Sequence, residues 1–293
     1  MKKTGLFVSL ATLILGCNSD KNSSKETFTT GTTNIMIEES VVPLSEDIIS
    51  VFKNYYDEAD FHISVSSEAQ LLNYLYNDSV RLVIIPRNLT AQEISYLKEN
   101  AATPRITPIA KEAIVFIGNR KNNDTLIRME DLIQQIQQNS NERIIVFDNI
   151  NSSLARKFKE DAKLTQESKN VYYMKNTKEV IEYISTNSKA IGIIGSNWLA
   201  QPDESIQKYK SSIRGLYVYN DSLQKYIRAT QSTITDNTYP LTRTINIIDI
   251  KGNYGLGRGL ASFAASDKGQ RIVLKAGLTP ITMPPREILI NQQ

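Results

Sequence analysis

Residues 68–100, EAQLLNYLYNDSVRLVIIPRNLTAQEISYLKEN, show a helix, a strand and a second helix in succession. The run VRLVIIP is apolar without alternation, as expected for a strand that is buried on both faces. TAQEISYLKEN then places Thr90 at an N-cap with Glu93 three residues later, which is the pattern of a capping box. Helices on either side of a buried strand predict an α/β fold with a parallel sheet and right-handed crossovers.

The same alternation continues in both directions from this stretch. Upstream, NIMIEE (34–39) and DFHISVSS (60–67) predict strands on either side of a helix at 45–59, whose acids we expect in its first turn. Downstream, ITPIAKEAIVFIGN (106–119) predicts a long strand. The further expected helices are 128–138, 152–163, 177–186, 256–265 and 267–276, and the further expected strands are 143–147, 170–174, 190–195, 213–219 and 242–250. The chain is thus predicted to form two α/β halves, the second inserted into the first if the C-terminal helices return to it.

The N-terminal residues 1–17, MKKTGLFVSLATLILGC, have two lysines, a short apolar run and a small residue before Cys17. This pattern predicts a secretory signal peptide, because the apolar run is too short to span a membrane stably. LILGC resembles a bacterial lipobox, which implies that Cys17 is the acylated first residue of the mature chain; an uncleaved anchor or a buried core cysteine is the alternative. Residues 18–33, NSDKNSSKETFTTGTT, predict a flexible tether. We therefore expect a protein on the periplasmic side of a bacterial cell envelope, anchored to a membrane by lipid.

The composition excludes several function classes. With 41% hydrophobic and 22% charged residues, the chain is typical of a soluble globular protein. A single histidine, His62, and a single cysteine argue against a zinc site or a Cys-His nucleophile. Loss of Lys2 and Lys3 with the signal peptide lowers the formal charge from +3 to +1, which argues against nucleic-acid binding. GLGRGL (255–260) lacks the dinucleotide-binding spacing, and no GxSxG or HExxH motif is present. We therefore expect that the protein binds no cofactor and no metal and that it is not an enzyme.

Polar side chains gather where the predicted strands end and the next helices begin, which is where ligands bind in open α/β sheets. Four such positions are Glu38-Glu39-Ser40, Ser66-Ser67-Glu68, Pro86-Arg87 and Asn151-Ser152-Ser153. Hydroxyls and unpaired N–H groups at helix starts suit a small oxyanion, and the guanidinium of Arg87 can hold two oxygens at once. The alternative is that each serine is an ordinary N-cap. Together these positions predict an anion site that contains no catalytic group.

Eight pieces of the sequence, in their order along the chain, resemble the phosphate-binding proteins of ABC transporters, the PstS type. They are VVPLSEDIISVFKNYY, VSSEAQLLNYLYND, IPRNLTAQE, IAKEAIVFIGN, DNINSSLARKF, KAIGIIGSNW, YPLTRTINI and SDKGQRIVLKAGLTP. The resemblance covers about residues 34–282, and YPLTR followed by KGQRIVLKAGLTP is its most specific part. It implies the type II periplasmic binding-protein fold, with lobe I at 34–112 and 245–293, lobe II at 113–244, and crossing strands at 109–117 and about 240–248.

The resemblance also implies a ligand site with departures from the family pattern. It assigns ligand-binding roles to a set of loop residues: Glu38, Glu39, Ser40, Ser66, Ser67, Arg87, Ser152 and Ser153. Many relatives carry Gly-Ser where this chain has Ile37-Glu38, serine in place of Glu39, and arginine in place of Asp148. Two carboxylates that face an anion each repel it by about 4 kcal/mol at 4 Å and an effective dielectric constant near 20. One acid can accept the proton of HPO₄²⁻, and the others require a counter-charge from Arg87, Lys111 or Arg243.

These residues lead to two functional hypotheses. The first is a lipid-anchored solute-binding protein that delivers a small oxyanion, with phosphate as the leading candidate, to an ABC permease. A ligand with a cationic or hydroxyl-rich part remains open, because of the acids in the first loop. The second is a lipoprotein that retains the scaffold as an interaction or sensing module. A phosphoester hydrolase is disfavoured, since no metal-ligand cluster or activated nucleophile is visible in the sequence.

Overall fold

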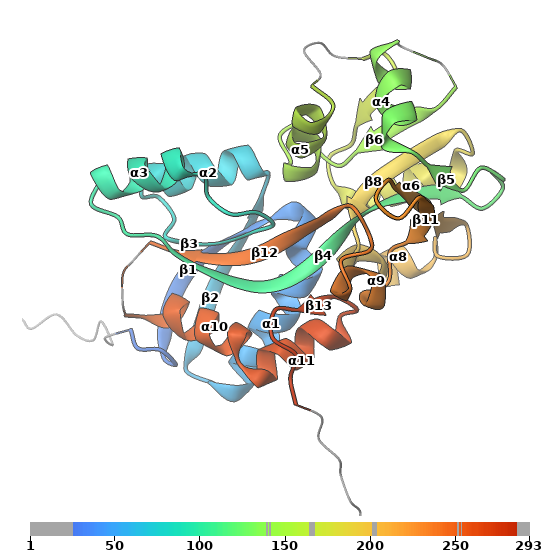
Figure 1. The fold of residues 1–293 in the computed structure, drawn as a ribbon. Coiled ribbons are helices and arrows are strands. Elements are labelled where there is room, and N and C mark those ends of the chain that lie inside the picture. The colour runs from blue at the N-terminus through green and yellow to red at the C-terminus, as the bar shows by residue number, and fades with distance from the viewer. Residues whose placement is uncertain are drawn as a thin grey trace, which may run out of the picture.

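The computed structural model describes residues 26–285, except 139, 141, 164–167, 201–203, 251 and 253. The predicted signal peptide and Cys17 lie outside this range. The chain forms two α/β lobes that are joined by two long strands, β4 (Arg105–Asn119) and β12 (Thr242–Asp249), which run through both lobes (Figure 1). The main sheet has the strand order β2-β1-β3-β12-β4-β8-β6-β7, so the crossing pair lies at its centre.

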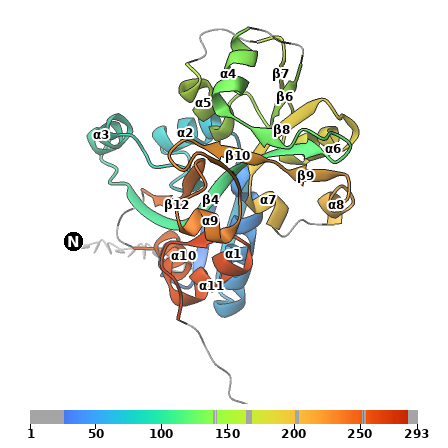
Figure 2. The same cartoon turned by 45° about the vertical axis from the view of Figure 1, so that its right-hand side comes forward.

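Lobe I contains the first strands, three helices after them, and two helices from the C-terminal part of the chain. Its elements are β1 (Gly31–Glu38), the 3-10 helix η1 (Glu39–Val41), α1 (Val42–Tyr55), β2 (Ala59–Ser66), α2 (Glu68–Tyr76), β3 (Leu82–Ile85), α3 (Ala91–Glu99), α10 (Leu256–Ala265), α11 (Asp267–Lys275) and β13 (Thr279–Pro280). α2 and α3 cover one face of the sheet, and α1, α10 and α11 cover the other (Figures 1 and 2). α10 and α11 pack in this lobe, so the second half of the chain is inserted into the first.

Burial on both faces explains the apolar run in β3. Leu82 and Ile84 pack into a core with α1 and α10, whereas Val83 and Ile85 pack into a separate core with α2 and α3. All four side chains are at most 2% exposed. Successive side chains of a strand point to opposite faces, so a strand covered by helices on both sides is apolar throughout.

Lobe II has its own core, which extends from Ala113 to Tyr239 and includes the second half of β4. Its elements are β5 (Leu126–Ile127), α4 (Met129–Gln137), β6 (Ile144–Phe147), α5 (Ser153–Asp161), β7 (Val171–Tyr173), α6 (Thr177–Thr186), β8 (Ala190–Gly195), α7 (Asn197–Ala200), α8 (Glu204–Gln207), β9 (Ile213–Gly215), β10 (Tyr217–Asn220), β11 (Lys225–Arg228) and α9 (Gln231–Thr235). Because the cores separate between the lobes, we propose the boundaries 112/113 and 244/245 as the lobe boundaries.

Several local predictions differ from the structure. The sheet is not parallel throughout, because β12 pairs antiparallel with β3 and β4, and β4 pairs antiparallel with β8. The strand predicted at 213–219 is divided at Leu216 into β9, which pairs with β4, and β10, which pairs with β5 and β11. α1 begins at Val42 with a proline in its first turn, so Glu46 and Asp47 lie beyond that turn.

The starts of α3 and β1 can also be compared with the sequence. The capping box of α3 is present, with both reciprocal hydrogen bonds between Thr90 and Glu93. β1 begins at Gly31, so residues 31–33 of the predicted tether pair with β2 at residues 59–61. Among the described residues, no helix combines the length and apolarity that a membrane crossing requires.

Candidate functional site between the lobes

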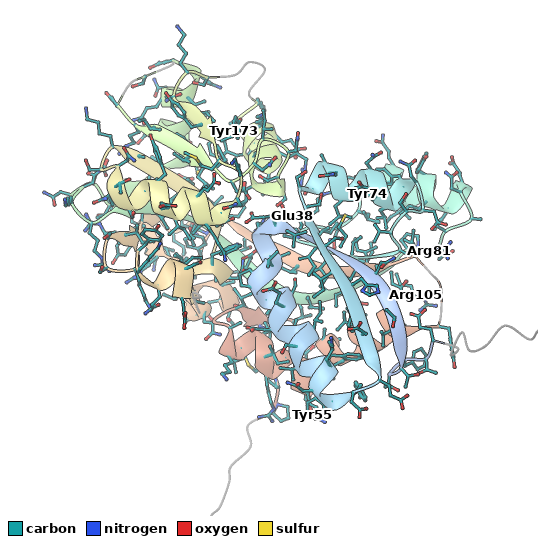
Figure 3. All side chains as sticks on the ribbon, turned by 180° about the vertical axis from the view of Figure 1, so that it is seen from behind. Glu38, Tyr55, Tyr74, Arg81, Arg105 and Tyr173 are labelled. Atoms are coloured by element: carbon teal, nitrogen blue, oxygen red, sulfur yellow. The ribbon has the colours of Figure 1, made fainter. Side chains whose placement is uncertain are left out.

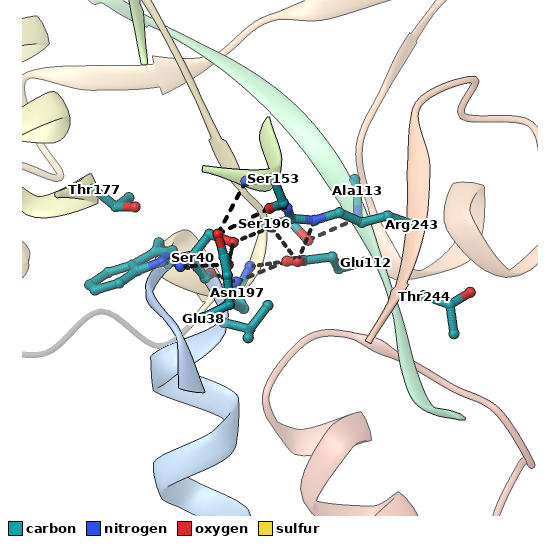
Figure 4. Close-up of polar contacts among 12 residues, drawn as sticks. Glu38, Ser40, Glu112, Ala113, Ser153, Thr177, Ser196, Asn197, Arg243 and Thr244 are labelled. Atoms are coloured by element: carbon teal, nitrogen blue, oxygen red, sulfur yellow. Dashed lines mark hydrogen bonds and ion pairs between the residues drawn. The ribbon is translucent and has the colours of Figure 1, made fainter. Parts of the chain in front are cut away.

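A buried carboxylate connects the two lobes. Glu38 ends β1, lies between the lobes and is 0% exposed (Figure 3). Its Oε2 accepts hydrogen bonds from the backbone N–H of Ser40, at 3.0 Å, and from the Ser40 hydroxyl. Its Oε1 accepts from Ser153 in lobe II, at 3.3 Å from the backbone N–H and 3.1 Å from the hydroxyl (Figure 4). Each lobe therefore supplies one N–H and one O–H to the same carboxylate.

Arg243 lies behind the two hydroxyls. Its Nη1 donates to the Ser153 hydroxyl and its Nη2 to the Ser40 hydroxyl, each at 2.8 Å. Its Nε donates to Glu112 Oε1 at 2.9 Å, and Arg243 and Glu112 face each other in the register of the crossing strands. Each serine thus accepts a hydrogen bond from the guanidinium and donates one to Glu38. This arrangement polarises the hydroxyls toward an anion.

The short helix η1, which carries Ser40, is fixed by lobe II. The Ser40 carbonyl accepts hydrogen bonds from Asn197 Nδ2 at 2.8 Å and from the indole N–H of Trp198 at 2.9 Å. Asn197 Nδ2 also donates to Glu112 Oε2 at 2.8 Å. We call these six residues the inner cluster: Glu38, Ser40, Glu112, Ser153, Asn197 and Arg243.

Two further acids border the inner cluster. Glu39 accepts hydrogen bonds from the backbone N–H and the hydroxyl of Thr177, at 3.0 and 2.9 Å, and so connects η1 to the start of α6 in lobe II. Asp148 follows β6 and is 0% exposed. Its Oδ1 accepts from the Ser152 hydroxyl at 2.5 Å and from the Asn149 N–H at 2.8 Å. Its Oδ2 is buried without a hydrogen-bond partner among the described residues.

Burial raises the pKa of the three acids Glu38, Glu39 and Asp148. Burial raises the pKa of Glu38 to about 7, with the positive charge of Arg243 opposing the rise and the charge of Asp148 adding to it. Burial raises the pKa of Glu39 to about 8, and Asp148 again adds to the rise. The pKa of Asp148 itself is also raised, chiefly by burial. The site therefore does not hold three full negative charges near neutral pH.

The residues that the sequence singled out do not all join this cluster. Ser40 and Ser153 do, together with Glu38. Ser152 instead caps α5, since its oxygen accepts from the Ala155 N–H at 3.2 Å, as the alternative interpretation proposed. Ser66 donates to Gln70 at 2.9 Å near the surface of lobe I. Ser67 holds the N-cap position of α2 without a side-chain hydrogen bond to the helix.

Arg87 lies in a second group between the lobes. Its guanidinium forms ion pairs with Glu93, at 2.7 Å, and with Glu68, at 3.3 Å. Glu68 also pairs with Arg156 of lobe II at 2.5 Å. We call Glu68, Arg87, Glu93 and Arg156 the outer cluster. Two carboxylates occupy the Arg87 guanidinium in this structure.

Sequence reasoning did not identify Glu112, Asn197 and Thr177, and it named Arg243 only as a counter-charge. Asn197 and Arg243 belong to KAIGIIGSNW and YPLTRTINI, two of the pieces that carried the family resemblance. Lys111, the other proposed counter-charge, instead bonds the Asn237 side chain on the surface. No group of three or more potential metal ligands occurs among the described residues.

Comparisons with known proteins agree with this architecture. A family model described as a PBP superfamily domain matches residues 22–268. A search of curated protein sequences finds no match. Among solved structures, a Clostridium perfringens protein with bound phosphate, assigned as a phosphate ABC transporter substrate-binding protein, has a TM-score of 0.71 at 17% identity. That match covers 86% of this chain and 100% of the other.

Two further solved structures share the fold. An ABC-type phosphate transport receptor from Vibrio cholerae has a TM-score of 0.63 at 14% identity, over 85% of this chain and 100% of that one. An OxyR2 regulatory domain from Vibrio vulnificus has a TM-score of 0.53 at 10% identity, over 80% of this chain and 98% of that one. At these identities, the likeness to solved structures establishes the two-lobed fold alone.

Proposed function

Because this chain belongs to the PBP superfamily, a family of solute-binding proteins and not of enzymes, we propose that it captures a small oxyanion between its lobes for an ABC importer. The observation that carries the proposal is the convergence of two N–H groups and two hydroxyls, from both lobes, on the carboxylate of Glu38. A carboxylate is an oxyanion, so these donors already form a site of the required chemistry.

Phosphate is the leading candidate for the solute. Two proteins of the same fold, from Clostridium perfringens and Vibrio cholerae, are described as phosphate-binding or phosphate-transporting. The unpartnered Oδ2 of Asp148 supports the same choice, because a protonated oxyanion can donate a hydrogen bond to it while sulfate cannot. Asp148 lies close enough to Glu38 to raise its pKa. The proposal takes Ser40 and Ser153 as direct donors and Arg243 as the charge behind them.

The location follows from the N-terminal sequence. We propose that Cys17 carries the lipid, that residues 18–25 connect it to the folded chain, and that the lobes lie on the periplasmic side of the membrane beside the permease. An extended residue spans at most about 3.5 Å, so this connection holds the first described residue within roughly 30 Å of the lipid. Mass spectrometry of the membrane fraction, with and without replacement of Cys17 by Ser, measures whether the lipid is attached.

Calorimetry tests the solute. The mature chain without its lipid is titrated with phosphate, sulfate and acetate at pH 7, and we expect heat with phosphate and a weaker response to sulfate. Absence of heat with every anion at about 1 mM, which corresponds to a binding free energy no better than about −4 kcal/mol, contradicts the proposal.

One observation favours a second candidate function. Glu38 already fills the donors, and the backbone N–H of Ala69 in α2 bonds the carbonyl of Asn151 in lobe II at 3.2 Å, so groups of the chain itself connect the lobes. A scaffold that closes on its own side chain suits an interaction or sensing module, and the OxyR2 regulatory domain shows that the same fold occurs in a regulatory protein. Small-angle scattering that is unchanged by any of the three anions supports this alternative.

A further inference from the structure

We propose that Glu38 is an internal surrogate for the solute: its carboxylate occupies the Ser40 and Ser153 donors until an incoming oxyanion displaces it. This inference rests on the proposed function, because it names the residue that sets the affinity and selectivity of the same site. It turns the acid that departs from the family pattern into the specificity-determining element of this chain.

The hydrogen bonds of Glu38 are those that a bound oxyanion makes. One carboxylate oxygen takes both donors of Ser40 in lobe I, and the other takes both donors of Ser153 in lobe II. The carboxylate thus bridges the lobes as a solute does in a closed binding protein. Ser153 is the first residue of α5, where unpaired N–H groups favour an anion.

Exchange is feasible because the carboxylate is held by neutral donors. Among the ion pairs of the described residues, Arg243 pairs with Glu112 and not with Glu38. The guanidinium reaches Glu38 only through the two serine hydroxyls. Another oxyanion that offers two oxygens to the same donors makes equivalent hydrogen bonds, so it can take the place of the carboxylate.

Charge balance requires Glu38 to leave when an anion enters. The inner cluster contains one cation, Arg243, which already pairs with the buried Glu112. Asp148 lies on its border, and its charge adds to the rise in the pKa of Glu38. A second anion would be repelled by the Glu38 carboxylate, because like charges repel strongly in a buried site. Displacement of the carboxylate toward solvent removes this repulsion, and the three side-chain torsions of a glutamate permit it.

The solute class follows from the geometry of the donors. The site takes an oxyanion that presents two oxygens to Ser40 and Ser153, and acetate reproduces the Glu38 carboxylate itself. Phosphate fits the same donors and adds an O–H for Asp148. Because each solute competes with Glu38, wild-type affinity is expected to be weaker than the donor set alone allows.

Removal of the surrogate tests the inference. In Glu38→Ala we expect phosphate to bind at least about tenfold more tightly than in wild type, a difference of about 1.4 kcal/mol, and acetate to become a measurable ligand. Glu46→Ala removes the same charge from the exposed face of α1 and is the matched control, with wild-type affinity expected. Glu38→Gln keeps the shape but not the charge; if Glu38→Ala does not fold, as judged by circular dichroism, Glu38→Gln replaces it in the comparison, with the same direction of change.

The outcomes separate this inference from the proposed function. If a folded Glu38 variant binds phosphate while wild type does not, the surrogate role of Glu38 is supported and the proposed function in anion import is contradicted. If wild type binds phosphate as tightly as the folded variants or more tightly, the surrogate is overturned and import stands. If neither wild type nor any folded variant binds phosphate or acetate, both are overturned.

Discussion

Glu38 and Glu68 are two of the acids of lobe I that reach lobe II, and they are held in opposite ways. Glu68, in the outer cluster, is 2% exposed and is met by two guanidiniums, those of Arg87 and Arg156. Glu38, in the inner cluster, is 0% exposed and is met by hydroxyl and N–H groups of Ser40 and Ser153. The two lobes are therefore connected at two places, once by ion pairs and once by hydrogen bonds from neutral donors.

The difference indicates which of the two bridges is exchangeable. An acid between two arginines is held by its charge, so its displacement would separate two ion pairs at once. An acid held by neutral donors can be replaced by any oxyanion of suitable size without changing the charge of those donors. We infer that the outer cluster is a fixed contact between the lobes and that the inner cluster is the solute site.

The largest expected effect comes from the cation of the inner cluster. Arg243→Met leaves Glu112, which is 0% exposed, without its ion-pair partner. Loss of one partner of a buried pair costs about 3–5 kcal/mol, so the free energy of unfolding in urea should fall by that amount. The double variant Arg243→Met with Glu112→Gln should recover part of the loss. If the free energy of unfolding of Arg243→Met falls by less than about 1 kcal/mol, the pair does not stabilise the crossing strands.

Titration of the inner site gives the next largest effect. The pKa of Glu39 rises from an ordinary 4.5 to about 8, chiefly through burial, so the folded chain keeps a proton that the unfolded chain releases. Unfolding therefore becomes easier as the pH rises from about 5 to 8, and the melting temperature should fall by about 5 °C over that window. Glu38 acts in the same direction, with a pKa of about 7.

Replacement of Glu39 isolates its share of this pH dependence. In Glu39→Gln the slope of melting temperature against pH should become clearly smaller, while Glu46→Gln, on the exposed face of α1, keeps the wild-type slope. Scanning calorimetry at pH 5, 6, 7 and 8 measures both. Equal slopes in wild type and Glu39→Gln would show that Glu39 is ionised in the folded protein.

A smaller effect tests how closely the inner cluster is packed. A Cβ added at Gly195 would lie 2.8 Å from Glu112 Oε2 and 2.9 Å from Arg243 Nη2. Gly195→Ala should therefore displace this pair and lower the free energy of unfolding by about 1–3 kcal/mol, with a matching loss of phosphate affinity. Gly215→Ala, where nothing lies within 4 Å of the added Cβ, is the control and should stay within about 0.5 kcal/mol of wild type. Two variants of equal stability would mean that the cluster tolerates displacement.

The sequence singled out the part of the inner cluster that depends on local order. Glu38 ends β1, Ser40 follows it, and Ser153 begins the helix after β6, so strand ends and helix starts were enough to single them out. Ser66 ends β2 and Ser67 follows it, but β2 is the edge strand of the sheet and its end lies away from the crossing strands. Strand order is a tertiary property, and local patterns do not contain it.

The pairing of Glu112 with Arg243 shows the other limit of sequence reasoning. The two strands were predicted, and the resemblance placed them as the crossing pair. Their antiparallel register, which sets Arg243 opposite Glu112 across 131 positions of sequence, depends on the packing of both lobes. A shift of one residue would turn each side chain to the opposite face of the sheet. The short β10–β11 hairpin was missed because its connection, DSLQ (221–224), lacks the Asn-Gly or Asp-Gly pair that marks a two-residue hairpin turn.

The smallest expected effect concerns the outer cluster. Arg156→Gln removes an ion pair whose arginine side chain is 37% exposed, so the free energy of unfolding should fall by no more than about 1 kcal/mol and phosphate affinity by less than about twofold. Lys157→Gln, which breaks a pair within α5, is the control. Only Arg156→Gln should speed hydrogen exchange at the Ala69 amide, because that amide bonds lobe II beside Glu68. A tenfold loss of phosphate affinity in Arg156→Gln would instead place the outer cluster in the solute site and remove the distinction between the two bridges.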